Sequence, residues 1–129
     1  MKRPGSISLW VRKAEGDFQT ATTMVRKRVQ PVPDNVCFCS QQCAEKYLKA
    51  FLIRHRIAFP KTHLLEDLLD LASTIDPALD ALRADVRVLH PYAMQVRYPG
   101  YEATVAESVE AVKIVRRVRT LLRKKLRLP

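Results

Sequence analysis

Glycine is scarce in this sequence, with 3 residues in 129, and no stretch alternates polar and apolar side chains over the length of a strand. Tight hairpin turns depend on glycine, so the shortage argues against a fold built from β-hairpins. No apolar run approaches the roughly 18 residues of a membrane-spanning helix. The amino-terminal stretch MKRPGSISLW carries charge without an apolar signal region behind it. We therefore expect a soluble, cytoplasmic protein that does not enter a membrane.

Cysteine is too rare for a disulfide framework. The 3 cysteines, Cys37, Cys39 and Cys43, are an odd number crowded into one short stretch, which suits a reducing compartment. Helical spacing predicts that Cys39 and Cys43 face the core while Cys37 points away. Together with His55 they do not form a set of four metal ligands, so we expect core residues, no metal and no cofactor.

Acidic residues are also few, with 13 Asp and Glu against 23 Lys and Arg, for a formal net charge of +10. No acid follows Glu110, and the segment after it contains Lys113, Arg116, Arg117, Arg119, Arg123, Lys124, Lys125 and Arg127. Cations near a helix carboxyl end can simply oppose the helix dipole or form a solvated face. Their number favours a second interpretation, in which this basic end attracts RNA or an acidic partner.

The apolar residues that are present recur at helical spacing. The expected helices cover about residues 6–29, 34–56, 63–72, 77–90 and 102–126. Asp34, Thr62 and Asp76 stand where helix caps are expected. We predict an all-α, up-and-down antiparallel bundle of four to five helices in one domain, residues 1–129, with a core over about residues 8–122 and a basic end over 113–129. Surplus apolar surface on the first and last helices predicts a homodimer.

Four stretches of the sequence carry a resemblance when taken together. The first helix contains Trp10, Ala14 and Asp17, and CFCSQQCAEKYLKAFL (37–52), KTHLLEDLL (61–69) and YAMQVRYPG (92–100) follow in order. In this combination the chain resembles the HEPN (higher eukaryotes and prokaryotes nucleotide-binding) domain family, over about residues 8–122. The resemblance implies a HEPN-like helical bundle that forms homodimers. It also implies a minimal nucleotidyltransferase as partner in a toxin–antitoxin-like system.

Many members of that family are metal-independent ribonucleases that use an arginine and a histidine a few residues apart, whereas others bind nucleotides or RNA without cutting. Arg83 and His90, with ADVRVL between them, are the candidates here. About two helical turns separate them, so both would project from one face. The guanidinium could hold a phosphate while the imidazole moves a proton. The alternative is a surface arginine and a histidine that ends a helix.

The segment LHPYAMQVRYPGY (89–101) interrupts the helical pattern with polar and aromatic residues. Arg97 matches the family position better than Arg83 does, and no histidine follows it, which argues against cleavage. Tyr92, Arg97 and Tyr98 are therefore predicted to form a nucleotide- or RNA-binding pocket. In a structural alternative, Arg97 pairs with Asp17, an acid within the first apolar stripe. In a third, a partner enzyme modifies Tyr92.

Two further residues match the family pattern. Glu45 is expected on the polar side of the second helix, paired with Lys49, and His63 is expected to bond nearby backbone at a helix start.

The favoured hypothesis is a nucleotide- or RNA-binding component of a HEPN and nucleotidyltransferase pair. The alternative is a ribonuclease toxin that uses Arg83 and His90.

Overall fold

The computed structural model describes residues 6–129, and that part of the chain contains helices and loops without a strand. The α-helices are α1 (Ile7–Met24), α2 (Pro33–Arg54), α3 (Leu65–Ile75), α4 (Arg83–Leu89) and α5 (Val105–Lys125). The 3-10 segments η1 (Pro77–Leu82), η2 (His90–Ala93) and η3 (Gln95–Arg97) flank α4. The predicted all-α bundle is confirmed. No helix among these residues is long and apolar enough to cross a membrane.

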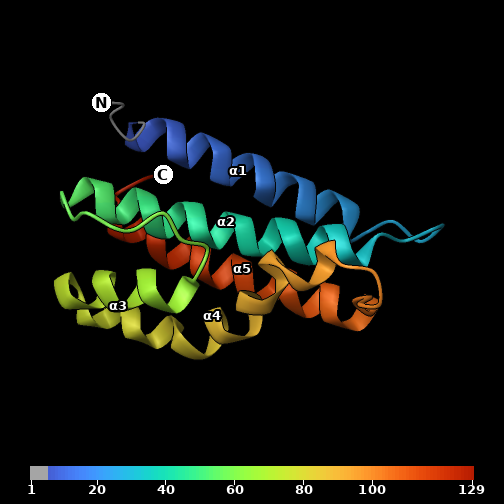
Figure 1. Ribbon diagram of the computed structural model, residues 1–129. Helices are drawn as coiled ribbons and strands as arrows, with labels where there is room; N and C mark the ends of the chain where they lie inside the picture. Colours follow the sequence, from blue (N-terminus) through green and yellow to red (C-terminus); the bar gives the residue numbers. More distant parts are fainter. Residues whose placement is uncertain (1–5) are drawn as a thin grey trace.

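Helix α2 is the centre of the bundle, with every other layer packed against it (Figure 1). α1 lies antiparallel along one side of α2, and α5 and the α3–α4 layer cover its other sides. The segment 55–64 runs back along α2 before α3 begins and forms a long return loop (Figure 1). Because of this return, residues that follow α2 in the chain lie beside the middle of α2.

Several helix ends differ from the predicted ones. α1 ends at Met24 rather than near residue 29. Asp34 does not cap α2: Val32 is the capping position, and Pro33 takes the first helical turn, where a missing N–H is no loss. The Asp34 carboxylate instead accepts a hydrogen bond from the Ala103 backbone N–H at 2.7 Å, which joins the start of α2 to the segment before α5.

The caps of the later helices follow the sequence more closely. Asp76 accepts from the Ala78 N–H at 3.1 Å, as expected of a cap, but the predicted single helix over 77–90 is divided into η1, α4 and η2. Pro91 within this run removes a backbone donor and fits the change to 3-10 geometry. Thr62 accepts from the Leu64 N–H at 3.0 Å, ahead of α3 rather than at its cap.

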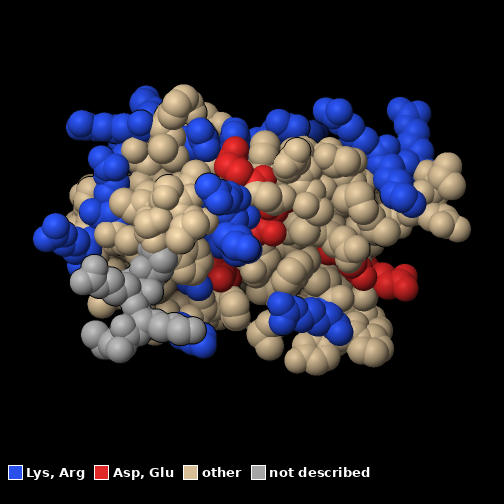
Figure 2. All heavy atoms as spheres, turned by 90° about the horizontal axis from the view of Figure 1, so that it is seen from above, with Lys and Arg blue, Asp and Glu red and all other residues tan. Residues whose placement is uncertain are grey.

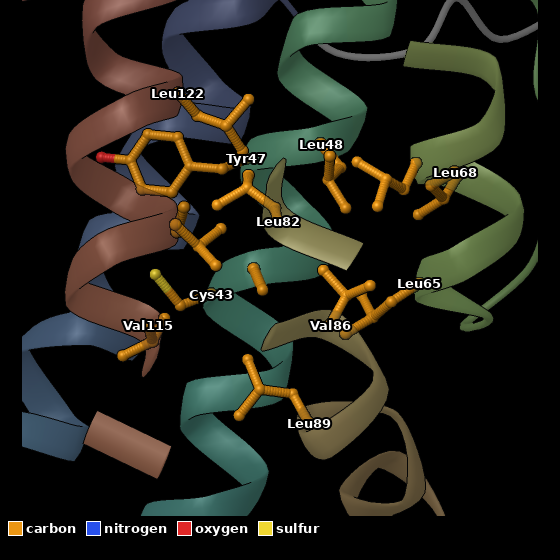
Figure 3. Packing of buried hydrophobic residues seen from close by; sticks show 14 of the residues in the cluster. Cys43, Tyr47, Leu48, Leu65, Leu68, Leu82, Val86, Leu89, Val115 and Leu122 are labelled. Atoms are coloured by element: carbon orange, nitrogen blue, oxygen red, sulfur yellow. The ribbon is translucent and has the colours of Figure 1, made fainter. Parts of the chain in front are cut away.

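The core consists mainly of leucine and other aliphatic side chains from α2, α3, α4 and α5 (Figure 3). Cys37 and Cys43 are fully buried and Cys39 is half-buried, so the prediction that Cys37 points away was wrong. The reason is that α2 is covered on several sides. Burial raises the pKa of the Cys37 thiol to about 12, which makes it an unreactive core residue.

A polar network under the outer surface ties α1, α2 and α5 together. The Tyr47 hydroxyl donates to Glu15 at 2.5 Å and accepts from Arg123 at 2.9 Å. Arg119 donates two hydrogen bonds to the same Glu15 carboxylate, at 2.6 and 2.7 Å. Burial, with the bond to Glu15, raises the pKa of Tyr47 to about 12. The Arg119 hydrogen bonds hold the pKa of Glu15 below its usual value.

Leu48→Ala should lower the free energy of unfolding by about 2–5 kcal/mol, because it removes a fully buried side chain and leaves a cavity in the core. Leu9→Ala is the matched control, since Leu9 is 50% exposed and its truncation should cost less than about 0.5 kcal/mol. Urea unfolding of both variants checks the difference. Equal losses in the two variants would contradict the position of the core.

Tyr47→Phe should cost about 1 kcal/mol at pH 8, because it removes the hydroxyl from the Glu15 network. The cost should shrink as the pH rises from about 10 to 12. The unfolded phenol then releases its proton while the folded one, with a pKa of about 12, retains it, so the wild-type protein loses stability that the variant does not lose. Unfolding curves of both proteins across that range provide the measurement. A cost that is constant with pH would contradict the prediction.

Candidate functional site

Three polar side chains on one face of α2 are buried, one helical turn apart. Gln41 is inaccessible to solvent, Glu45 is 3% exposed and Lys49 is 7% exposed. The prediction that Glu45 and Lys49 lie on a polar outer face was therefore wrong, although the two do form an ion pair at 3.0 Å. The returning segment 55–64 covers this face of α2. Helical periodicity alone does not predict that burial, because the covering residues lie outside the helix.

The Glu45 carboxylate is the centre of this cluster. It accepts from the Lys49 ammonium, and His63 Nδ1 lies 2.9 Å and 3.1 Å from its two oxygens. Gln41 donates to Glu45 and to the His63 carbonyl, at 3.3 Å each. A buried carboxylate is costly unless it is paired and hydrogen-bonded, and all these contacts supply that compensation. An ionised carboxylate can only accept hydrogen bonds, so the contact between an ionised Glu45 and His63 requires the proton on Nδ1.

A groove of about 840 Å³ opens on the Lys49 side of the cluster. Its lining residues are Trp10, Lys49, Ile53, Arg56, Ile57, Ala58, Phe59 and Lys61. The Lys49 ammonium lies 5.6 Å from the Trp10 ring centroid and 5.9 Å from that of Phe59. The groove therefore combines two aromatic side chains with three cations, and no acid belongs to its lining.

A smaller hollow of about 250 Å³ lies on the His63 side. Its lining residues are His63, Leu64, His90, Pro91, Ala93, Met94 and Gln95. The His63 side chain is 63% exposed while its partner Glu45 is buried. His90 Nδ1 is buried and has no hydrogen-bond partner among residues 6–129. Two imidazoles thus share one small hollow, and only one of them is held by a carboxylate.

Arg83, which the sequence paired with His90, does not line that hollow. Its guanidinium faces α3 and contacts Asp70 at 2.6 Å, Asp80 at 2.7 Å and Glu66 at 3.4 Å. Hydrogen bonds to Asp80 and Asp70 raise the pKa of Arg83 further. A phosphate would have to displace these carboxylates, so Arg83 is a structural residue here rather than a phosphate clamp.

The residues predicted to form one pocket in the segment 89–101 differ in their exposure. Tyr92 is only 5% exposed and lies in the core near Cys37, where burial raises the pKa of its phenol. It is therefore closed to base stacking and to a modifying enzyme in this conformation. Arg97 is exposed, with its guanidinium carbon 4.8 Å from the Phe38 ring centroid, and Tyr98 is 60% exposed.

Asp17 does form an ion pair, but its partner is Lys46 at 2.5 Å and not Arg97 as predicted. α1 packs along α2, so the closest cation to this carboxylate comes from the neighbouring turn of α2. Within residues 6–129, no group of three or more His, Cys, Asp and Glu side chains is placed to hold a metal ion.

A family model and two solved structures are similar to this chain. The HEPN domain model matches residues 7–125. ST0689, described as an archaeal HEPN homologue, has a crystal structure that is similar with a TM-score of 0.73 and 23% identity, over 95% of this chain and 98% of that one. TT1696 from Thermus thermophilus is similar with a TM-score of 0.70 and 24% identity, over 92% of this chain and 97% of that one.

A comparison with curated proteins gave no match. At these identities, the two solved structures support the fold and not an activity. The family match covers nearly all of the helical bundle, from the start of α1 to the end of α5. The chain therefore belongs to the HEPN domain family.

Proposed function

We propose that this HEPN-family protein binds nucleotides or RNA, and that one base enters the groove between Trp10 and Phe59. The observation that carries the proposal is the composition of that groove, in which two aromatic side chains surround the buried ammonium of Lys49. Aromatic faces stack on any base, and lysine and arginine at the rim neutralise phosphate. Arg56 and Lys61 occupy that rim.

Lys49 is prepared for this role by the cluster beneath it. Its ion pair with the buried Glu45 fixes the ammonium, so little side-chain freedom is lost when a ligand binds. The net charge of Lys49 and Glu45 together is close to zero. The attraction for phosphate at this groove therefore comes from Arg56 and Lys61.

The basic end of the chain supports RNA binding in a more limited way than the sequence suggested. Of its cations, Arg117, Arg119, Arg123 and Lys125 form ion pairs with acids of the bundle. Lys113, Arg116, Lys124 and Arg127 have no acidic partner within the described residues. Figure 2 looks onto the face that carries α1: Lys and Arg lie along its upper edge, at its left end and near its centre, while Asp and Glu are fewer and lie near the centre and toward the lower right.

The assembly proposed for this protein is a homodimer that pairs with a minimal nucleotidyltransferase in a toxin–antitoxin-like system. The family resemblance of the sequence supports it. A ribonuclease that uses Arg83 and His90 is disfavoured by the three carboxylates around Arg83.

Trp10→Ala should weaken nucleotide and single-stranded RNA binding by about 1–3 kcal/mol, because it removes one stacking surface of the groove. Trp10 is the 1 tryptophan of the sequence, so quenching of wild-type fluorescence by ATP, GTP or a short RNA reports on the groove directly. Calorimetry supplies the comparison for the variant. Lys61→Ala should weaken binding too, whereas Lys13→Ala, on the exposed side of α1, is the control. Unchanged affinity of Trp10→Ala for nucleotides and RNA would refute binding in this groove.

RNA affinity should fall as salt rises, because bound phosphates release counterions. Removing Lys113, Arg116 and Lys124 together should reduce the slope of log affinity against log salt by about 0.7 for each lost phosphate contact with single-stranded RNA. Arg117→Ala should reduce the slope much less, because this arginine is already paired with Asp85 at 2.8 Å. Fluorescence anisotropy at several salt concentrations measures the slope for wild type and for each variant. Equal slopes in all three proteins would contradict a role for the basic end.

A further inference from the structure

We propose that the groove selects guanine over adenine and cytosine, and that Lys49 is the residue that sets this preference. The inference rests on the proposed function, because it requires that a base enters between Trp10 and Phe59. It adds the identity of that base, which stacking does not decide, since every base has an aromatic face. The choice between bases therefore depends on the polar groups that the groove presents to the edge of the ring.

The side chains that line the groove, all within residues 6–129, offer hydrogen-bond donors and no acceptor. Four of them have polar atoms: Trp10, Lys49, Arg56 and Lys61. An indole, an ammonium and a guanidinium carry N–H groups and no acceptor. The remaining side chains of the lining are apolar. The groove therefore matches a ligand edge that presents acceptors, whereas an amino group would find no side chain of the lining to accept from it.

The Lys49 ammonium lies beside both aromatic rings and has donors to spare. It is 5.6 Å from the Trp10 ring centroid and 5.9 Å from that of Phe59. An ammonium has three N–H donors. Its one hydrogen-bond partner among residues 6–129 is the Glu45 carboxylate, at 3.0 Å. Because Lys49 is only 7% exposed, water has little access to the other donors, which lie where the edge of an inserted base would arrive.

The direction of these donors is set before a ligand binds. Glu45, which holds the ammonium, is itself 3% exposed and accepts from Gln41, and His63 Nδ1 lies 2.9 Å from one of its oxygens. Lys49 therefore cannot turn toward a different ligand edge without leaving a buried carboxylate unpaired. A donor that is fixed in this way rejects a mismatched edge as well as binding a matched one.

Guanine is the base whose edge fits neighbouring donors best. Its O6 and N7 are adjacent acceptors, and a lysine or arginine bound to this pair is the commonest base-specific contact in protein–DNA complexes. Adenine has an amino group beside N7, and cytosine also presents an amino group, so each would direct N–H donors at the ammonium. Donors that face each other in a buried place remain without acceptors, which weakens binding. Uracil, with a single carbonyl on the corresponding edge, should bind with intermediate affinity.

Binding of GMP, AMP, CMP and UMP to the full-length protein tests the preference, with calorimetry and Trp10 fluorescence as the measurements. GMP should bind roughly 5–150-fold more tightly than AMP or CMP, the discrimination expected of a bidentate base contact. Inosine monophosphate, which retains O6 and N7 but lacks the amino group of guanine, should bind like GMP. 7-deaza-GMP, which lacks the N7 acceptor, should bind about tenfold more weakly or worse.

Lys49→Gln should abolish the preference, because an amide offers both a donor and an acceptor and suits adenine as well as guanine. Lys61→Gln is the matched control. It lies at the rim of the groove, so it should weaken GMP and AMP by the same factor and leave their ratio unchanged. Lys49→Gln also leaves Glu45 without its ammonium, and thermal unfolding shows whether it folds. If it does not, the series of ligands with wild type still decides the question.

The outcomes separate this inference from the proposed function. Equal affinities for GMP, AMP and CMP, or tighter binding of AMP, would overturn the guanine preference and leave nucleotide binding in the groove intact. Undiminished binding of 7-deaza-GMP, or much weaker binding of inosine monophosphate, would overturn recognition through O6 and N7. A folded Lys49→Gln that retains the full preference would overturn the role of Lys49. Absence of binding by all four nucleotides would overturn the proposed function as well.

Discussion

The ion pair between Glu45 and Lys49 is the interaction on which the polar interior of this protein depends. Both groups are more than nine-tenths buried, and removing one partner of such a pair leaves an uncompensated charge at a cost of about 3–5 kcal/mol. Glu45 holds several partners at once, because its second oxygen contacts His63 and Gln41. One carboxylate therefore fixes an ammonium at the aromatic groove and an imidazole at the hollow, and the geometry of each depends on the other.

The position of α2 explains why such a cluster can exist in a small bundle. α1, α5 and the α3–α4 layer all pack against this helix, so its side chains are shielded on nearly every side. The remaining face is covered by the return of residues 55–64 rather than by another helix. A covering segment of loop can bring side chains such as Phe59 and His63 close to the helix, and its own backbone carbonyl at His63 satisfies Gln41.

The sequence predicted the helices and the family well because apolar periodicity and caps are local signals. It failed where a side chain's surroundings depend on distant segments. Arg83 is near His90 in the chain, yet its guanidinium forms ion pairs with acids of α3 and η1. Tyr92 looked like a stacking residue and is buried instead. The spacing of Gln41, Glu45 and Lys49 by four residues was a visible signal of one shared polar face, but its burial follows from the return segment.

The attachment of α1 has a consequence for the motions of the molecule. α1 packs mainly along α2 and meets α5 through side chains, so its hold on the bundle relies on one face, on the Asp17–Lys46 pair and on the contacts of Glu15 with Tyr47 and Arg119. A helix secured in this way is a natural unit of partial unfolding, with earlier amide exchange than the helices beneath it. Its detachment would carry away Trp10 and dismantle one wall of the groove. The hollow of the two histidines, built from other segments, would survive.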